Sequence, residues 1–220
     1  MRVEVLPDAT AVAQRGAAIV ADRARAAVAE RGRFAVALSG GRTPWAMVAA
    51  LAGEDLPWEH VSVFQVDERV ALDSGPDRNL TQLLAALPPA AAPAEIAPMS
   101  VTGDLDDAAK AYAALLPRRL DLVHLGLGPD GHTASLVPGD PVLAVADRDV
   151  APTGVYQDRR RLTLTYPALN RAREVLWLVT GEDKRGALRR LRDGDMAIPA
   201  GRVQTAVQVL VADVAAAGEV

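Results

Sequence analysis

Short apolar runs of strand length recur along this chain, and segments of helical character lie between them. The runs are four to six residues long and cover 34–38, 61–66, 122–127, 162–165, 175–179 and 207–211. Strands that alternate with helices are typical of an α/β fold with a mostly parallel sheet. No internal repeat, charge block or linker divides residues 1–220, so we expect one domain.

Helices are expected between these strands. The first covers 8–31, where Asp8 is a suitable N-cap and Gly32 a suitable stop. The others are predicted to begin after Thr43 and run to Leu51, and to cover 80–87, 104–116 and 182–192. Two further short strands are expected near Ile96 and Val150, within segments that are otherwise rich in loop-forming residues.

Composition excludes several classes of protein. Hydrophobic residues make up 50% of the 220 residues, which is enough for a substantial core. The net charge of −4 provides no basic field for nucleic acid or an anionic membrane. Cysteine is absent, so disulfides and thiolate sites are excluded. We find no signal peptide or membrane span, and we expect a cytoplasmic protein, with a monomer as the reasonable oligomeric state.

Two turns that directly follow strands are rich in glycine, and ligands of open α/β sheets bind at such strand ends. In the first turn, Gly40 and Gly41 allow backbone amides to approach a ligand, while Thr43 is a suitable cap before Pro44. An anion could bind at the N-terminus of the helix that follows. The alternative is a tight, well-capped turn, and the Walker A pattern is absent.

The second turn, 126–131, matches the dinucleotide pattern Gly-x-Gly-x-x-Gly. That site needs a full helix after the turn, but Pro138, Gly139 and Pro141 follow within ten residues of Gly131. We therefore expect no nicotinamide or flavin at this position.

His132 follows the second turn in a small, polar setting. Asp130, two residues earlier, can hold one ring nitrogen and favour one tautomer, an arrangement typical of a general base. Zinc binding is the competing interpretation, but the three histidines form no pair with metal-ligand spacing. We expect structural roles for His60 and His124.

Charged residues follow two other strands. Asp67, Glu68 and Arg69 come directly after the strand at 61–66, which favours a ligand contact over a solvated turn. Lys184, one of only two lysines, stands near the start of an expected helix, where its charge opposes the helix dipole unless a ligand uses it. The alternative for Lys184 is an ordinary surface position.

Together these segments resemble the 6-phosphogluconolactonase family, whose relatives include the glucosamine-6-phosphate deaminases. The resemblance runs through nearly the whole chain and rests on 39–44, 67–69, 126–138 with its core Asp-Gly-His-Thr-Ala-Ser-Leu, 161–165 and 179–184. It implies a modified Rossmann-like three-layer domain with a mostly parallel central sheet flanked by helices.

The resemblance implies hydrolysis of 6-phospho-D-glucono-1,5-lactone without metal, cofactor or covalent intermediate. His132 would activate water as a general base, and Asp130 would hold the imidazole of His132 in its productive tautomer. Arg69 would contact either the developing oxyanion or the phosphate. The remaining residues implied to contact substrate are Gly40, Gly41, Arg42, Thr43, Asp67, Asn79, Gly131, Arg161 and Lys184.

The chain departs from the family pattern at Arg42 and Arg78, where serine is usual, which leaves the role of Arg42 open. Arg69 and Ser135 stand where the deaminase branch has Tyr and Phe, and both differences favour the lactonase. Two alternatives remain: isomerase and deaminase chemistry, with a carboxylate such as Asp67 as the base, and a sugar-phosphate sensor without catalysis.

Overall fold

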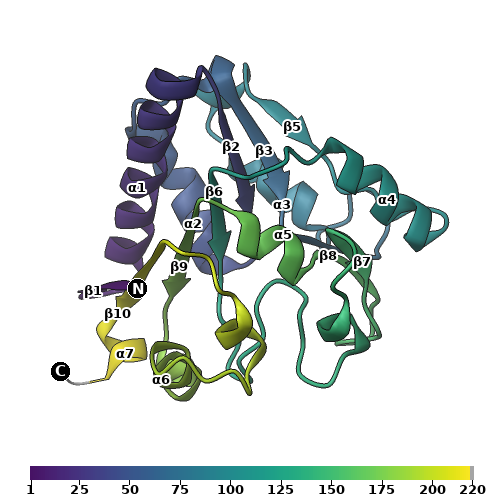
Figure 1. Ribbon diagram of the computed structural model, residues 1–220. Helices are drawn as coiled ribbons and strands as arrows, with labels where there is room; N and C mark the ends of the chain where they lie inside the picture. The colour runs from purple at the N-terminus through teal and green to yellow at the C-terminus, as the bar shows by residue number, and fades with distance from the viewer. Residues whose placement is uncertain (219–220) are drawn as a thin grey trace.

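The computed structural model describes residues 1–218, so the last two residues of the expected domain lie outside the described part. Its main sheet consists of β1 (Arg2–Leu6), β2 (Phe34–Leu38), β3 (Val61–Gln65), β5 (Glu95–Ala97), β6 (Leu122–Leu125), β9 (Glu174–Val179) and β10 (Gln208–Asp213). These seven strands are all parallel and lie in the order β1-β10-β9-β6-β2-β3-β5 (Figure 1). The predicted α/β class with a mostly parallel sheet is confirmed.

Helices cover both faces of this sheet. The helices are α1 (Ala9–Arg31), α2 (Arg42–Ala50), α3 (Asn79–Ala86), α4 (Leu105–Leu115), α5 (Tyr166–Arg171), α6 (Arg185–Arg192) and α7 (Val214–Ala217). The first three pack into one buried apolar cluster, and the last four pack into another. The result is the predicted three-layer arrangement.

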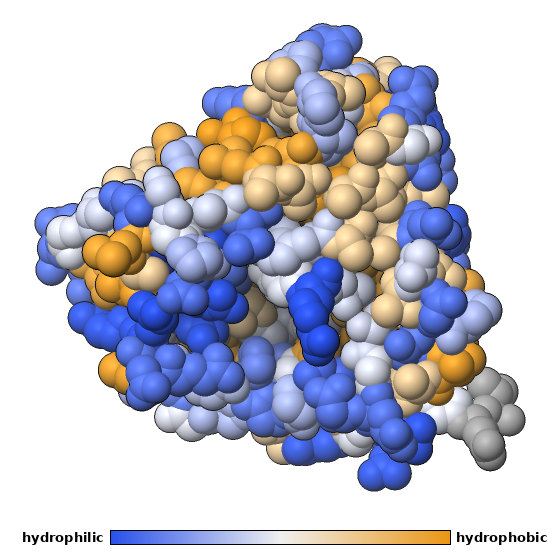
Figure 2. Space-filling model, turned by 180° about the vertical axis from the view of Figure 1, so that it is seen from behind, coloured by the Kyte–Doolittle hydropathy of each residue, from blue (hydrophilic) through white to orange (hydrophobic). Residues whose placement is uncertain are grey.

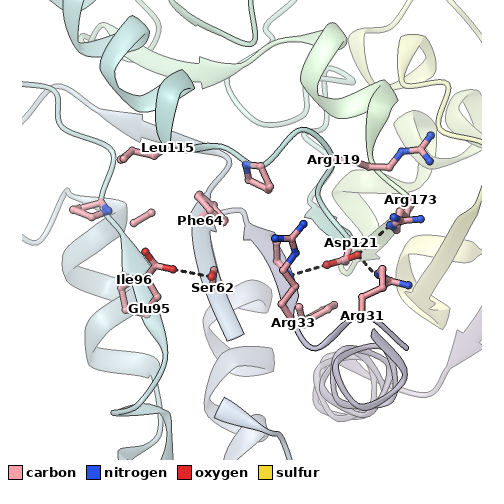
Figure 3. Close-up of a pocket in the computed structure, with 15 residues that line it drawn as sticks. Arg31, Arg33, Ser62, Phe64, Glu95, Ile96, Leu115, Arg119, Asp121 and Arg173 are labelled. Atoms are coloured by element: carbon pink, nitrogen blue, oxygen red, sulfur yellow. Dashed lines mark hydrogen bonds and ion pairs between the residues drawn. The ribbon is translucent and has the colours of Figure 1, made fainter. Parts of the chain in front are cut away.

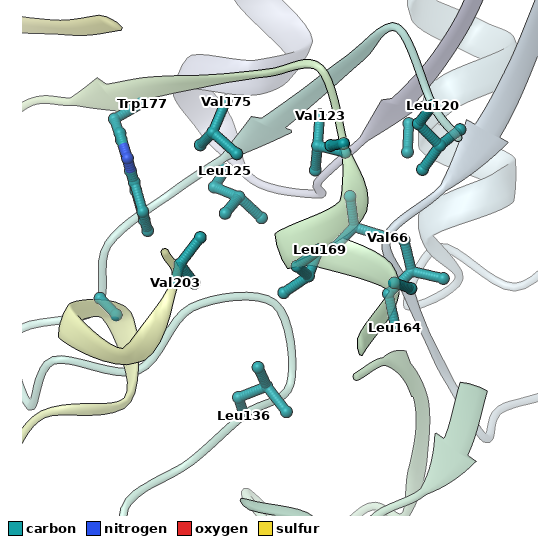
Figure 4. Close-up of a cluster of buried hydrophobic side chains, with 14 of the residues drawn as sticks. Val66, Leu120, Val123, Leu125, Leu136, Leu164, Leu169, Val175, Trp177 and Val203 are labelled. Carbon is teal, nitrogen blue, oxygen red and sulfur yellow. The ribbon is translucent and has the colours of Figure 1, made fainter. Parts of the chain in front are cut away.

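The side chains of β2 point alternately to the two faces of the sheet, so this one strand contributes to both clusters. Phe34, Val36 and Leu38 belong to the cluster of α1 and α2, whereas Ala35 and Ala37 belong to the opposite cluster. Successive strand side chains point to opposite faces, so a strand buried on both faces is apolar throughout. Figure 4 shows part of the second cluster, where side chains from β6 and β9 meet Leu169 of α5.

Helix α1 begins and ends as its sequence indicates. The Asp8 side chain accepts a hydrogen bond from the backbone N–H of Ala11 at 2.8 Å. Gly32 ends the helix with a left-handed φ of 72°, which glycine adopts without a steric penalty.

A second, three-stranded antiparallel sheet lies beside the main one and corrects two expectations. Its strands are β4 (Asp67–Arg69), β8 (Arg161–Leu164) and β7 (Val150–Pro152), paired in the order β4-β8-β7. Residues 67–69, expected only to follow the strand at 61–66, therefore form a strand of their own, and the strand at 162–165 lies outside the main sheet. The chain changes sheets at Val66, whose N–H donates to Leu38 and whose carbonyl accepts from Leu164.

Other differences concern element ends. Strand β1 and helices α5 and α7 were not predicted, because each is short and α5 begins with Tyr-Pro. Helix α2 begins at Arg42 with Gly41 as its N-cap, so the prediction of Thr43 as cap is wrong. Among residues 1–218, no helix is both long enough and apolar enough to cross a bilayer.

Trp177 provides a test of this core. It is fully buried in β9 and its indole N–H donates to Gln208 at 2.9 Å. We expect Trp177→Ala to lower the free energy of unfolding by about 3–5 kcal/mol, because it removes a large side chain from a close-packed core. The 87% exposed Leu72 is the control, and Leu72→Ala should change stability by less than about 0.5 kcal/mol in urea unfolding. Equal effects of the two changes would contradict this packing.

Candidate active site

A cavity of about 830 Å³ lies at the carboxyl ends of β2, β6 and β9, with residues of β4 and β8 on its other side. The part of the surface toward these strand ends is mostly hydrophilic and is hollowed near its middle, whereas apolar residues gather farther away (Figure 2). Most of the residues that the sequence singled out line this cavity: Gly40, Gly41, Arg42, Thr43, Asp67, Arg69, Asn79, His132, Arg161 and Lys184.

His132 and Asp130 form a close pair in the turn after β6. The ring Nδ1 of His132 lies 2.6 Å from Oδ1 of Asp130, and the backbone N–H of His132 donates to the same oxygen at 3.1 Å. Gly128 makes this approach possible, because a Cβ at its position would lie 2.1 Å from Nδ1. The turn thus fixes the imidazole against the carboxylate.

The charge on Asp130 decides which ring nitrogen is free. Partial burial raises the pKa of Asp130, but the hydrogen bond from the His132 backbone and the nearby imidazole outweigh it and lower the pKa overall. An ionised Asp130 only accepts hydrogen bonds, so it favours the proton on Nδ1. Nε2 of neutral His132 then keeps its lone pair, as a general base requires.

Arg69 and Arg161 lie opposite each other on β4 and β8. Arg161 is buried, and burial lowers its pKa although the carboxylate of Asp67 raises it. Its Nη1 lies 3.5 Å from Ser135 Oγ, which in turn donates to Asp67 at 2.6 Å. Burial raises the pKa of Asp67, while the Ser135 bond and the charge of Arg161 act in the opposite direction.

Residues of β4 and β8 form one wall of the cavity, and Glu68 of β4 holds this wall in place through buried contacts with α3. Its fully buried carboxylate accepts from the backbone N–H groups of Asn79 and Leu80 at 2.8 Å each, at the N-terminus of α3. Arg78 also forms an ion pair with the Glu68 carboxylate, with Nε 3.2 Å from Oε2. Arg78 therefore has a structural role here, although serine is usual at its position in the family pattern. Asn79 is thereby held beside Asp67, whose backbone oxygen accepts from its amide at 3.0 Å.

The opposite wall consists of the first glycine turn and the segment after β9. Thr43 Oγ1 lies 2.7 Å from Thr180 Oγ1, so the two segments touch. Lys184 is half-buried, and its ammonium donates to Asp183 at 2.8 Å. Arg42 is exposed at the cavity edge. Backbone amides at the start of α2, a lysine and an arginine on one wall suit an anionic group.

Some expected residues lie elsewhere. Asp130 does not line the cavity and acts through His132. Gly131 faces away, because a Cβ there would lie 2.6 Å from Ile198. His124 is fully buried, and burial lowers its pKa to about 3, in agreement with a structural role.

No full helix follows the turn at 126–131, and within residues 1–218 no three His, Asp or Glu side chains gather as metal ligands.

Tyr156, Gln157 and Thr180 line the cavity but were not predicted. Tyr156 contacts both chemically important groups: its ring lies edge-to-face with His132, with centroids 5.5 Å apart, and the Arg161 guanidinium lies 5.0 Å from the ring centroid. Its neighbour Gln157 has a left-handed φ of 50° and accepts from Arg161 at 3.2 Å. The only sequence signal was an aromatic residue in a polar loop, which is weak alone.

Comparison with known proteins identifies relatives of the whole chain. Residues 7–211 match the family model described as glucosamine-6-phosphate isomerases/6-phosphogluconolactonase. A 6-phosphogluconolactonase of Nostoc sp. is 37% identical over 98% of this chain and 96% of its own length. One of Synechocystis sp. is 40% identical over 69% of this chain and 68% of its own length. The crystal structure of a 6-phosphogluconolactonase from Shewanella baltica shares the fold, with a TM-score of 0.88, 24% identity and 97% coverage of both chains.

The contact between Tyr156 and His132 makes a testable prediction. Tyr156→Leu removes the ring that packs against the imidazole, so the His132 ring should be held less firmly against Asp130 and the share of the Nδ1–H tautomer should fall. Tyr156→Phe keeps the ring and should keep one tautomer. Nitrogen-15 NMR of the neutral histidines measures this, with His60 and His124 as references in the same spectrum. A single Nδ1–H tautomer in the leucine variant would show that Asp130 suffices alone.

Proposed function

The chain belongs to the family of glucosamine-6-phosphate isomerases and 6-phosphogluconolactonases, and we propose that His132 is the general base of its reaction. That reaction is the hydrolysis of 6-phospho-D-glucono-1,5-lactone to 6-phospho-D-gluconate, the second step of the oxidative pentose phosphate pathway. The observation that carries the proposal is the pair of His132 and Asp130, 2.6 Å apart beside a cavity lined with cationic side chains.

Water is the nucleophile in the proposed mechanism. Nε2 of His132 accepts a proton from water as the water oxygen attacks the C1 carbonyl of the lactone. The tetrahedral intermediate then collapses, the bond between C1 and the ring oxygen breaks, and the imidazolium returns its proton to that oxygen. Asp130 stays ionised where histidine titrates, because its pKa is lowered, and it stabilises the imidazolium.

We assign the two ends of the substrate to opposite walls of the cavity. We assign the 6-phosphate to the wall that carries Gly40, Gly41, Thr43 and Lys184, where phosphate would replace Asp183 as the partner of the ammonium. Arg42 at the edge of this wall adds positive charge.

The lactone ring then faces the wall of β4 and β8. There Arg69 is assigned to the developing oxyanion, while Asp67, Asn79 and Arg161 contact the sugar. A phosphate held far from the reacting carbonyl orients that carbonyl, so its binding energy contributes to catalysis. Gly131 supports the turn and has no direct contact in this proposal.

The proposal places the protein in the cytoplasm as a monomer, without nucleic-acid or membrane partners. Its net charge of −4 supports the absence of polyanion binding.

Replacement of His132 tests the base. We expect His132→Ala to lower kcat by about 10²- to 10⁴-fold with little change in KM, because it removes proton transfer but not the phosphate site. Freshly prepared lactone is the substrate, the product is coupled to 6-phosphogluconate dehydrogenase, and the spontaneous rate is subtracted. The exposed His60 is the control, and His60→Ala should retain full activity.

Three results would refute the assignment. They are unchanged turnover by the His132 variant, release of ammonia from glucosamine 6-phosphate by the wild type, and saturable binding of sugar phosphate without turnover.

Replacement of Lys184 tests the phosphate site. Lys184→Ala should raise KM for the phosphorylated lactone by about 10- to 100-fold and leave kcat nearly unchanged, as expected for loss of one charge-assisted hydrogen bond. The rate with unphosphorylated gluconolactone should not change. Lys110→Ala, at the only other lysine, is the matched control. An equal loss with both lactones would place Lys184 outside the phosphate site.

A further inference from the structure

Ser135 is a fully buried residue that has no part in the mechanism proposed above. It comes three residues after His132, in the segment that follows β6. Its hydroxyl donates to Oδ2 of Asp67 on β4 at 2.6 Å, and its backbone N–H donates to Oγ1 of Thr163 on β8 at 3.2 Å. Ser135 therefore joins the segment of the proposed base to the wall of β4 and β8.

The backbone before Ser135 adopts an unusual conformation. Ala134 has a left-handed φ of 51°, which is unfavourable for a residue with a Cβ. The backbone N–H of Leu136 donates to the carbonyl of Thr133 at 2.9 Å, and Oγ1 of Thr133 donates to the carbonyl of Gly126 at 2.8 Å. Such strain persists only where the surroundings impose it, and it is concentrated at functional sites. Here the conformation places the serine hydroxyl against a buried carboxylate.

The Asp67 carboxylate is buried among charges of both signs. Burial and the neighbouring Glu68 raise its pKa, whereas Arg161 on β8 and Arg69 on its own strand lower it, and the pKa is raised overall. The hydrogen bond from Ser135 lowers the pKa of Asp67 more than either arginine does. Among the groups that favour the ionised form of Asp67, the Ser135 hydroxyl thus has the largest effect.

Ser135 occupies one of the two oxygens of this carboxylate. The other, Oδ1, has only a weak contact with the amide nitrogen of Asn79, at 3.4 Å, because that amide donates to the backbone oxygen of Asp67 at 3.0 Å. Asp67 lines the first cavity, so Oδ1 can accept a hydrogen bond from a ligand.

Arg161 is fixed by contacts of its own. Its Nη2 donates to Oε1 of Gln157 at 3.2 Å, and its guanidinium lies 5.0 Å from the centroid of the Tyr156 ring. Its Nη1 lies 3.5 Å from Oγ of Ser135, so the hydroxyl separates this cation from the Asp67 carboxylate. With Arg161 held in place, loss of the hydroxyl would leave Asp67 without its closest donor, and the pKa of Asp67 would rise further.

We propose that Ser135 is a positioning residue, which holds the Asp67 carboxylate so that Oδ1 accepts a hydrogen bond from a hydroxyl group of the bound sugar. The guanidinium of Arg161, on the same wall, donates to a neighbouring hydroxyl. A carboxylate beside a guanidinium suits a ligand with adjacent hydroxyl groups, and the ionised carboxylate binds such a ligand more strongly than the neutral acid does. This inference rests on the proposed function, because the sugar is the substrate assigned there.

Isothermal titration with 6-phosphogluconate tests the proposal, because this stable product keeps the phosphate and the hydroxyl groups. In Ser135→Ala the pKa of Asp67 rises, so more of the carboxyl is neutral at a given pH than in the wild type. The ratio of the two Kd values, variant over wild type, should therefore be largest near pH 6 and fall by about threefold or more by pH 8.5. Titration of the phosphate and of His132 affects both proteins alike and cancels from the ratio.

Ser62 provides the matched control, because its hydroxyl also donates to a carboxylate. Its Oγ lies 2.9 Å from Oε2 of Glu95 in a second cavity, of about 420 Å³, at the opposite end of the sheet (Figure 3). The second cavity shares no residue with the first, and Glu95 is exposed. Ser62→Ala should therefore leave the Kd for 6-phosphogluconate unchanged at every pH.

A second measurement needs no ligand. Carbon-13 NMR of protein labelled at aspartate follows the carboxyl carbon of Asp67, and Asp67→Asn assigns its signal. Ser135→Ala should raise the midpoint of this titration by about 1–2 pH units, as expected for loss of a hydrogen bond to a charged group. Ser135→Cys keeps the volume but donates more weakly, so it should give a smaller rise and serves if the alanine variant does not fold.

Two results would overturn the proposal. A ratio of Kd values that stays constant with pH would give Ser135 only a packing role, and an unchanged carboxyl titration would show that its hydroxyl does not hold the charge of Asp67. Failure of the proposed function would look different. The wild type would then neither hydrolyse the lactone nor bind 6-phosphogluconate, which would remove the sugar contact, although the carboxyl titration would still respond to Ser135→Ala.

Discussion

The buried carboxylate of Glu68 is the interaction on which one wall of the candidate active site depends. An unpaired charge in the interior is costly, and Glu68 avoids that cost through two backbone amides of α3, the guanidinium of Arg78 and the amide of Gln65. The amides lie at the positive end of the helix dipole, which further favours the negative charge. Because neighbouring side chains of a strand point to opposite faces, the inward position of Glu68 turns Asp67 and Arg69 toward the cavity.

The parallel sheet supplies the rest of the site. The segments after β2, β6 and β9 are far apart in the sequence, yet their strands are neighbours and end at the same edge. The central one of the three, β6, leads to His132, and its two neighbours lead to the first glycine turn and to the segment that carries Lys184. The small antiparallel sheet adds the opposite wall. The segments that line the cavity are thus each positioned by a rigid strand, and they do not belong to a single loop.

The sequence predicted the main sheet well because buried parallel strands are continuous apolar runs. It also pointed to His132, Lys184 and the first glycine turn as candidate site residues, and all of them line the cavity. It missed the strand at Asp67–Arg69, because three charged residues in a row resemble a solvated turn, and the partner that buries Glu68 lies eleven residues away in α3. Tyr156 was missed because its place in the cavity depends on contacts with His132 and Arg161, and no local sequence pattern encodes those contacts.

Pairing of β1 with β10 has a consequence for how the chain is made. Residues 2–6 are made long before residues 209–213, which are their only sheet partner among residues 1–218. The β1 segment therefore stays unpaired until β10 has been made, and its docking depends on closing the loop of residues 7–208. Contacts so distant in sequence form slowly, and unpaired strands are prone to association with other chains. Chaperone demand and loss by misassembly during expression should therefore depend on this edge strand more than on any residue of the catalytic cavity.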